Sequence, residues 1–243
     1  MIIQPVTFAL NPRLDQPDLT AQIRAAGRIQ IPDFLEPSGA NALLDHLQCA
    51  TDWVHVLNAG DKVYEIASEQ MVAMSAKERA ALDQKVDREA AKGFQFRFDT
   101  IRAPDDERER ASSKQLIVEF AQFLSSRPVI DWFRAVTGCE RIDFADCQAT
   151  RYTQKAFLTR HDDKVDGKRR HFAYVLGLTR DWREEWGGLL LFPQKGAMIV
   201  EALVPQYNVL TLFEVGQPHS VSQVATYAPA PRFSVTGWLR SRR

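Results

Sequence analysis

The sequence of 243 residues predicts an α+β fold, in which a helical layer from the N-terminal half supports an antiparallel β-core formed by the C-terminal half. Two observations carry this prediction. Helical patterns dominate the first half, whereas from residue 142 onward short strand-like runs follow one another between turns. Strands that succeed one another without intervening helices form antiparallel sandwiches or barrels, not βαβ sheets. Hydrophobic residues make up 45% of the chain, enough for a sizeable core.

Four helices are expected in the first half, at 38–47, 75–93, about 112–125 and about 128–137. The first follows Pro37, a residue suited to a helix start, and carries a stripe of alanine and leucine. The second begins with an S-x-x-E capping box formed by Ser75 and Glu78, and Gly93 ends it.

Three other segments of the first half are expected to be strands or loops. Phenylalanines alternate with polar residues over 94–98, the period of a strand with one apolar face. Residues 52–66 hold a polar turn at Gly60 between two strand-like runs, a pattern typical of a mobile cover over a barrel mouth. The charged run at 104–110 is expected to be a solvated loop.

The strand-like runs of the second half lie at 142–153, 171–179, 187–193, 198–204, 208–215, 219–224 and 232–239. Gly187 and Gly188 open one of them, where a bulge or a close backbone approach is expected. Trp182 and Trp186 precede or adjoin this run and are expected to shield the barrel or to pack beneath its loops.

Composition narrows the possible partners and the compartment. Lys+Arg and Asp+Glu both number 31, so no overall basic field favours direct binding to nucleic acid or to a membrane. No stretch approaches the roughly 18 apolar residues of a membrane span, and the first residues lack the features of a signal peptide. We therefore expect a cytoplasmic protein. Its cysteines, Cys49, Cys139 and Cys147, form no C-x-x-C pair and are expected to be buried, reduced thiols.

Three residues in one order along the chain predict a metal site. His161 and Asp163 are two positions apart at the end of an expected strand, so an extended backbone would point both side chains to one side. His219, at the start of a late strand, adds a second imidazole. Two imidazoles and one carboxylate on one face of iron(II) leave positions open for a bidentate 2-oxo acid and O₂. An isolated H-x-D motif is otherwise most often part of a polar loop.

The last expected strand supplies a residue for the far end of such an acid. A distal carboxylate inside an apolar barrel needs a partner, and Arg232 offers a bidentate fork at the start of the strand. Ser234, two residues later on the same strand face, adds a hydroxyl. By itself, an arginine at a strand start is more often a surface residue.

Four stretches of sequence carry a family resemblance: HDD at 161–163, WGGLLLF at 186–192, VPQYNVLTLFEVGQPHSV at 204–221 and RFSVTGW at 232–238. They resemble the prolyl-hydroxylase branch of the 2-oxoglutarate/iron(II) dioxygenases, and most of all the catalytic domain of ribosomal prolyl 3-hydroxylases. The resemblance implies a double-stranded β-helix, a jelly-roll or cupin-like barrel. It also implies one dioxygenase domain over 1–243, with helical support and a lid in 1–140 and the metal-binding β-core in 141–243.

The same resemblance implies the chemistry. His161, Asp163 and His219 would be the catalytic iron ligands, and Arg232 would anchor 2-oxoglutarate. Tyr152 falls where the family has a tyrosine that hydrogen-bonds this co-substrate. The reaction would hydroxylate a C–H bond with Fe(II), 2-oxoglutarate and O₂, with ascorbate as a reductant. A prolyl residue in a protein or peptide, a ribosomal protein among the candidates, would be the substrate. Eukaryotic members carry a second copy of the domain, which this chain does not show.

Several assignments keep an alternative. Tyr152 is equally compatible with a half-buried strand aromatic, and Tyr174 could face the 2-oxoglutarate cavity or simply pack in the core. Asp162 is a rival to Asp163 as metal ligand, although its side chain should point away from His161. For the whole protein, the alternative is a cupin-like barrel that binds a metal or small molecule without oxygenase activity. Such a barrel has no need of an arginine at position 232.

Overall fold

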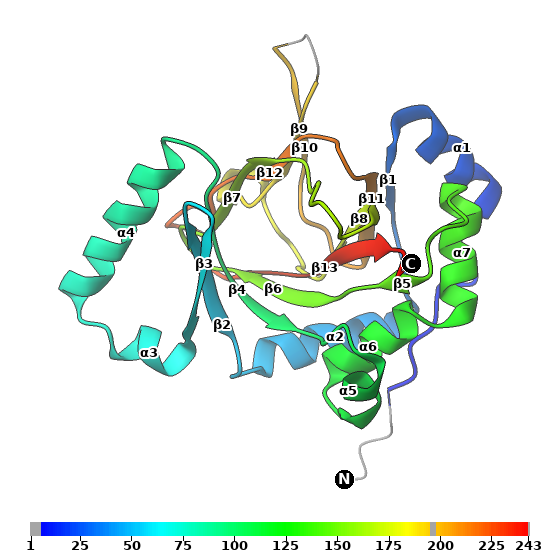
Figure 1. The fold of residues 1–243 in the computed structure, drawn as a ribbon, viewed down its shortest axis with the longest axis horizontal. Helices are drawn as coiled ribbons and strands as arrows, with labels where there is room; N and C mark the ends of the chain where they lie inside the picture. The colour runs from blue at the N-terminus through cyan, green and yellow to red at the C-terminus, as the bar shows by residue number, and fades with distance from the viewer. Residues whose placement is uncertain (1–5, 195–197, 243) are drawn as a thin grey trace.

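The structure is a computed structural model that describes residues 6–194 and 198–242 (Figure 1). A curled antiparallel sheet forms its centre, in the strand order β1-β11-β8-β13-β6-β4-β7-β12-β9-β10, with β2 pairing with β3 and β4, and β5 with β13. The strands are β1 (Arg28–Ile31), β2 (Val54–Ala59), β3 (Lys62–Ala67), β4 (Phe96–Arg102), β5 (Phe144–Ala145), β6 (Gln148–Tyr152), β7 (Phe157–His161), β8 (Arg170–Gly177), β9 (Leu190–Pro193), β10 (Val200–Leu203), β11 (Val209–Glu214), β12 (His219–Val221) and β13 (Arg232–Arg240). The antiparallel β-core expected for the second half is confirmed.

The curl of the sheet creates an inner face. In Figure 1, β4, β6 and β13 form the floor of a half-barrel, and β8 with β11 and β7 with β12 rise on opposite sides of it. Strand β4, from the first half of the chain, pairs with both β6 and β7 and so joins the two sides. The first half therefore contributes to the barrel itself as well as to the helical layer.

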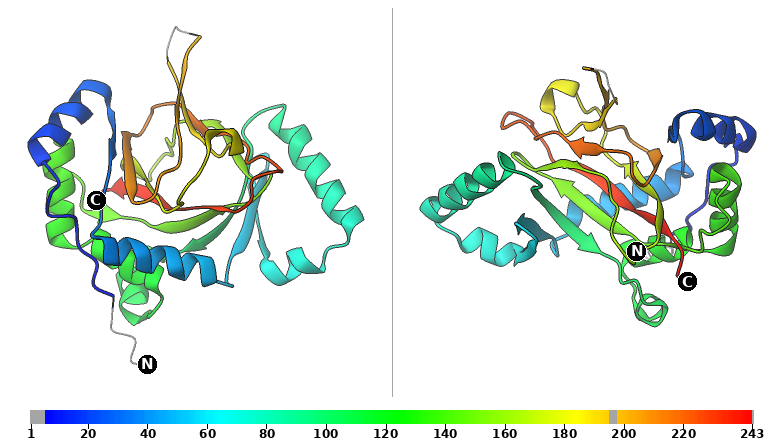
Figure 2. Two further views of the ribbon diagram at one scale, coloured as in Figure 1. Left: turned by 180° about the vertical axis from the view of Figure 1, so that it is seen from behind. Right: turned by 45° about the horizontal axis from the view of Figure 1, so that its top comes forward.

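The helices are α1 (Gln16–Ala26), α2 (Pro37–Cys49), α3 (Ser68–Ala73), α4 (Ala76–Ala90), α5 (Glu107–Ser112), α6 (Leu116–Leu124), α7 (Arg127–Thr137) and the 3₁₀ turn η1 (Glu184–Trp186). Helices α2, α6 and α7 form a layer on the outer face of the sheet. Leu43 of α2, Phe120 of α6 and Phe133 of α7 share one buried cluster with Leu176 and Val235 of the sheet. Helices α3 and α4 lie apart from this layer, beside the β2–β3 hairpin (Figure 2).

The helix predictions are confirmed in their main points. Helix α2 begins at Pro37, and Ser75 caps α4 through the predicted box, in which the Glu78 amide donates to Ser75 Oγ and the Ser75 amide donates to Glu78 Oε2. The expectation of a solvated loop at 104–110 is wrong, because α5 begins at Glu107 and the Arg110 side chain is buried. Arg110 donates hydrogen bonds to backbone carbonyls of other elements, and these bonds satisfy the charged side chain inside the fold.

The alternation predicted over 94–98 holds only in part. Strand β4 starts at Phe96, while Phe94 lies outside it and is 49% exposed. Gln95, expected on a polar face, is fully buried. Its side-chain amide donates to the backbone carbonyl of Asn58, which compensates for the loss of water. Residues 52–66 include the β2–β3 hairpin, which extends the sheet beside β4.

The cysteines are not uniformly buried. Cys147 is buried and Cys139 is partly exposed, whereas Cys49 is exposed because it is the last residue of α2. The expectation of three buried thiols is therefore wrong for Cys49. Within the described part of the chain, every helix is too short or too polar to cross a bilayer.

Candidate metal centre and co-substrate cavity

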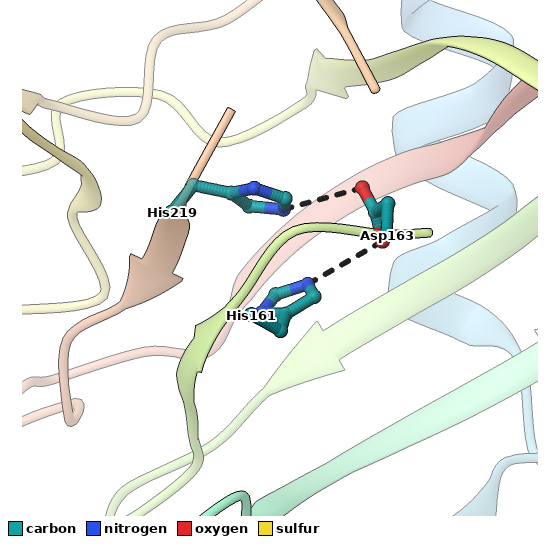
Figure 3. Close-up of side chains that lie close together, drawn as sticks. All are labelled: His161, Asp163 and His219. Carbon is teal, nitrogen blue, oxygen red and sulfur yellow. Dashed lines mark ion pairs between the residues drawn. The ribbon is translucent and has the colours of Figure 1, made fainter. Parts of the chain in front are cut away.

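The three predicted ligands come together from two paired strands and the turn after one of them (Figure 3). His161 is the last residue of β7, and His219 is the first residue of β12. These strands are antiparallel, and His161 lies directly opposite His219. Because both side chains point to the inner face, their ring centroids are only 4.1 Å apart.

The backbone conformation that places Asp163 beside the histidines differs from the predicted one. Strand β7 ends at His161, and Asp163 has a left-handed backbone with φ of 63°. The extended backbone expected through this residue is therefore wrong, although the carboxylate lies beside both histidines. Arg170 Nη1 donates to the backbone carbonyl of Asp163 at 3.2 Å and supports this unusual turn.

The ligand atoms lie at distances that suit one metal ion. His161 Nε2 is 3.4 Å from Asp163 Oδ1, and His219 Nε2 is 3.3 Å from Asp163 Oδ2. Ligands bound at about 2.1 Å and at right angles to one another are roughly 3 Å apart. One ligand atom from each residue lies within 4.8 Å of the other two. Two imidazoles and one carboxylate with this spacing fit three adjacent positions around a divalent ion.

Backbone carbonyls fix the imidazole tautomers. His161 Nδ1 is 3.0 Å from the carbonyl oxygen of Thr159, and His219 Nδ1 is 2.9 Å from that of Gln217. A carbonyl only accepts, so each Nδ1 carries the proton and donates it. Each ring therefore directs Nε2 toward Asp163, and Nε2 is the nitrogen left to bind a metal.

The Asp163 carboxyl is kept ionised. Burial raises its pKa, but hydrogen bonds and charge from His161 and His219 outweigh burial and hold the pKa of Asp163 well below its ordinary value. A carboxylate that stays deprotonated is ready to bind a cation over a wide pH range.

A cavity of about 540 Å³ opens beside these residues. All seven predicted site residues line it: His161, Asp163, His219, Arg232, Tyr152, Ser234 and Tyr174. Residues 52–66 do not contribute to its lining, whereas Phe96 and Phe98 of β4 do. A closing movement of the 52–66 segment over the mouth stays a prediction.

Arg232 is a buried cation without an anionic partner among the residues that the structure describes. Arg232 is the first residue of β13, and only 4% of it is exposed. Tyr152 is the one titratable group that influences its charge, and no carboxylate of the described residues forms an ion pair with it. Its Nε is buried and donates to no described group. Burial lowers the pKa of Arg232, which shows the cost of keeping this charge away from water. The side chain is therefore suited to an anion that enters the cavity.

The remaining predicted residues surround Arg232. The guanidinium lies 5.2 Å above the ring of Tyr152, which also stacks on Phe98. Ser234 Oγ is 2.8 Å from Thr150 Oγ1, and both hydroxyls are buried at the cavity wall. Tyr174 Oη donates to the backbone carbonyl of Asp146 at 2.7 Å, so its hydroxyl retains acceptor capacity only.

Sequence reasoning singled out neither Arg170 nor Trp238. Both line the cavity, and the Arg170 guanidinium lies 3.4 Å from the centroid of the Trp238 ring. The signal available in the sequence was weak: Arg170 follows the metal loop, and Trp238 shares a strand face with Arg232. Asp162, the rival ligand, accepts a hydrogen bond from the Lys164 amide and is not in the His-Asp-His cluster.

The other predicted structural residues have packing or hydrogen-bonding roles. Trp182 packs edge-to-face on Trp186, and its Nε1 donates to the carbonyl of Gly187. A Cβ on Gly187 would lie 2.0 Å from the backbone oxygen of Gln223, so the predicted close approach is confirmed.

A family comparison covers the C-terminal part of the chain. Residues 147–240 match the model of the 2OG-Fe(II) oxygenase superfamily. The prolyl 3-hydroxylase OGFOD1 of Xenopus laevis is 34% identical over 115 residues, which are 44% of this chain and 22% of that protein. The prolyl 3-hydroxylase sudestada1 of Drosophila melanogaster is 28% identical over 138 residues, 51% of this chain and 25% of the relative. The match thus spans about a quarter or less of these relatives.

Solved structures agree on the fold. A prolyl-4-hydroxylase of Pseudomonas putida superimposes with a TM-score of 0.56 at 20% identity, over 94% of this chain and 100% of that one. A prolyl hydroxylase from Trichoplax adhaerens, in complex with a hypoxia inducible factor peptide fragment, gives a TM-score of 0.60 at 16% identity, over 93% and 89% of the two chains. The predicted double-stranded β-helix with a helical layer is confirmed. Residues 147–240 are thus similar to the 2OG-Fe(II) oxygenase superfamily.

Proposed function

We propose that the protein is a 2-oxoglutarate-dependent dioxygenase that hydroxylates a prolyl residue in a protein or peptide. One observation carries this proposal: a His-Asp-His cluster and a buried, unpaired arginine line the same cavity. A barrel that only binds a metal would have no reason to bury the Arg232 charge without a partner. The superfamily match and the prolyl hydroxylases among the relatives support the same conclusion.

Each site residue has a distinct part in this proposal. His161, Asp163 and His219 hold Fe(II) with nitrogen and oxygen donors whose spacing fits one ion. Arg232 pairs with the distal carboxylate of 2-oxoglutarate and so replaces the hydration that this group loses on entering the cavity. Bound iron supplies the activation of O₂ that organic side chains cannot provide. The chain's own contribution is to orient the reactants and exclude water.

Residues beside Arg232 complete the co-substrate site. Among the described residues no hydrogen-bond partner of the Tyr152 hydroxyl is found, so it is available to a ligand in the cavity. Ser234 adds a hydroxyl two positions from Arg232 on the same strand. Tyr174, on the neighbouring strand β8, contributes to the cavity wall, because its hydroxyl already donates to the Asp146 carbonyl.

The substrate and setting follow from the relatives and from the family resemblance. We propose a prolyl side chain in a protein, with a ribosomal protein as the first candidate, and ascorbate as the reductant that keeps the iron in its divalent state. The cytoplasm is the proposed compartment. Residues 1–243 act as one domain, since β4 of the first half completes the barrel of the second.

The test is anaerobic addition of Fe(II) and 2-oxoglutarate to the metal-free protein. The expected result is a weak visible charge-transfer band that saturates at one equivalent of each, followed by succinate formation when O₂ is admitted. Arg232→Ala should bind the metal but require much more 2-oxoglutarate to develop the band. A protein that binds Fe(II) yet never develops the band with saturating 2-oxoglutarate is a binding barrel, and the proposal is then wrong.

A further inference from the structure

Gln217, in the turn before His219, is attached to the N-terminal part of the chain by its side chain. Gln217 Nε2 donates to the carbonyl oxygen of Gly27 at 2.7 Å, and Arg28 Nη1 donates to Gln217 Oε1 at 3.1 Å. Both polar atoms of the amide are thus bound to residues about 190 positions earlier. The side chain has no rotational freedom left that keeps both bonds.

The backbone of Gln217 has a second task. Its carbonyl accepts the hydrogen bond from His219 Nδ1 at 2.9 Å, which sets the tautomer and rotation of that imidazole. One residue therefore connects the start of β1 with a predicted metal ligand. Any shift of the Gln217 backbone would turn the His219 ring relative to Asp163.

The surroundings are shaped for this contact. Gly27 has φ of 66°, and a Cβ at this position would lie 2.5 Å from Gln217 Nε2. Arg28 is itself fixed, because its Nε donates to Glu201 Oε2 at 2.9 Å and its guanidinium lies 4.9 Å from the centroid of Phe192. The Phe192 ring in turn lies 6.0 Å from that of His219. Polar and apolar contacts thus converge on the same imidazole.

We propose that Gln217, clamped by Gly27 and Arg28, is a positioning residue that sets the orientation of His219 and thereby the affinity of the site for its metal. This inference rests on the proposed function, because it takes His219 as a ligand. Removing a partner that orients a metal-bound histidine typically weakens metal affinity by 10- to 100-fold. Gln217→Ala keeps this backbone carbonyl and only frees it from the clamp, so divalent-metal binding should weaken by up to about tenfold, the low end of that range.

The chain offers a matched control in Asn208. Its side chain also clamps the β-core to the N-terminal half, since Asn208 Oδ1 accepts from the Leu35 amide at 3.0 Å and Nδ2 donates to the Leu35 carbonyl at 2.8 Å. Asn208 is absent from the cavity lining and forms no described contact with a metal-ligand residue. Asn208→Ala removes a clamp of the same kind without touching the imidazole.

The experiment titrates Mn(II) into metal-free full-length wild type, Gln217→Ala and Asn208→Ala, with calorimetry for the dissociation constant and a thermal melt for stability. Gln217→Ala should bind Mn(II) several-fold to about tenfold more weakly, with a modest drop in melting temperature. Asn208→Ala should lose more stability yet bind like wild type. Arg28→Ala, which frees one end of the amide, should give an intermediate affinity and serves as the second variant if Gln217→Ala does not fold.

Two outcomes overturn the inference. Unchanged Mn(II) affinity in both Gln217→Ala and Arg28→Ala shows that the clamp does not act through His219. An equal loss of affinity in Asn208→Ala shows that general loosening, and not positioning, weakens the metal. Wild type that binds no Mn(II) contradicts the proposed function itself, and this result is distinct from the other two.

Discussion

Replacement of Arg232 separates an oxygenase from a metal-binding barrel most directly. Arg232 is buried, no carboxylate of the described residues pairs with it, and its Nε lacks an acceptor. We expect the distal carboxylate of 2-oxoglutarate to be that missing partner. Arg232→Lys keeps the charge but loses the planar fork, so it should weaken 2-oxoglutarate binding while leaving metal affinity nearly unchanged.

The magnitude follows from burial. Breaking one side of a buried charge pair costs roughly 3–5 kcal/mol, because the other charge stays desolvated. At about 1.4 kcal/mol for each factor of ten, Arg232→Ala should weaken 2-oxoglutarate binding by at least about a hundredfold. Arg232→Lys should lose roughly tenfold, since charge-assisted hydrogen bonds contribute about 1.5–3 kcal/mol.

The assay is a double-mutant cycle on the ligand and the protein. Affinities of wild type and Arg232→Ala are measured by calorimetry in Mn(II), once with 2-oxoglutarate and once with 2-oxopentanoate, in which a methyl group replaces the distal carboxylate. The 2-oxopentanoate affinity should be poor and nearly insensitive to the mutation. Arg240→Lys is the matched control, because this arginine on the same strand already pairs with Asp105 and Asp146.

The refuting result is an equal loss of affinity for both acids on Arg232→Ala. Arg232 would then not contact the distal carboxylate, and the oxygenase assignment would lose its strongest support. A loss that appears equally in Arg240→Lys would instead indicate that the strand, and not the guanidinium, was disturbed.

Two further predictions concern carboxylates. Asp163→Ala should abolish Mn(II) binding and succinate formation in a folded protein, whereas Asp162→Ala should retain most of both; the reverse pattern would mean that the ligand register is wrong. Burial raises the pKa of Asp83, but hydrogen bonds and charge from Lys155 and Arg97 outweigh it and lower that pKa from 3.8. A depressed folded-state pKa adds stability above the unfolded-state pKa that is lost as pH falls through the folded-state pKa, so Asp83→Asn should flatten the acid-side decline in melting temperature. An unchanged decline would contradict the ion pairs.

The order of four residues along the chain predicted that they would lie together, and the structure does place them around one cavity. His161 ends β7, Asp163 follows it, and His219 and Arg232 begin β12 and β13. Their roles stay predictions. The sequence could not predict the backbone conformation of Asp163. A left-handed φ at a non-glycine residue depends on tertiary contacts such as the hydrogen bond from Arg170 to the Asp163 carbonyl.

Burial of polar residues was harder to predict than burial of apolar ones. Arg110 and Gln95 read as solvated in the sequence but lie inside the fold, where backbone carbonyls of distant segments accept their hydrogen bonds. The hydrogen bonds that hold the Gln217 side chain could not be predicted for the same reason, since Gly27 and Arg28 are about 190 positions away in the sequence. The hydrophobic pattern of a segment predicts which face of a helix or strand is apolar. It does not predict which distant backbone carbonyl will accept a hydrogen bond from a buried polar side chain.

The strand order yields a last prediction, on the independence of the β-core. Strands β6 and β7 do not pair with each other; each pairs with β4, which comes from the first half of the chain. A fragment of residues 141–243 would therefore have an open gap in the middle of the sheet, with backbone donors and acceptors of both strands unpaired beside an apolar inner face. We expect this fragment, although it contains the predicted metal ligands and all of 147–240, to lack a cooperative thermal transition and to bind Mn(II) at least a hundredfold more weakly than the full chain. Native-like circular dichroism with a sharp melt and full-strength Mn(II) binding in the fragment would show that β4 is dispensable, and the single-domain proposal would then be wrong.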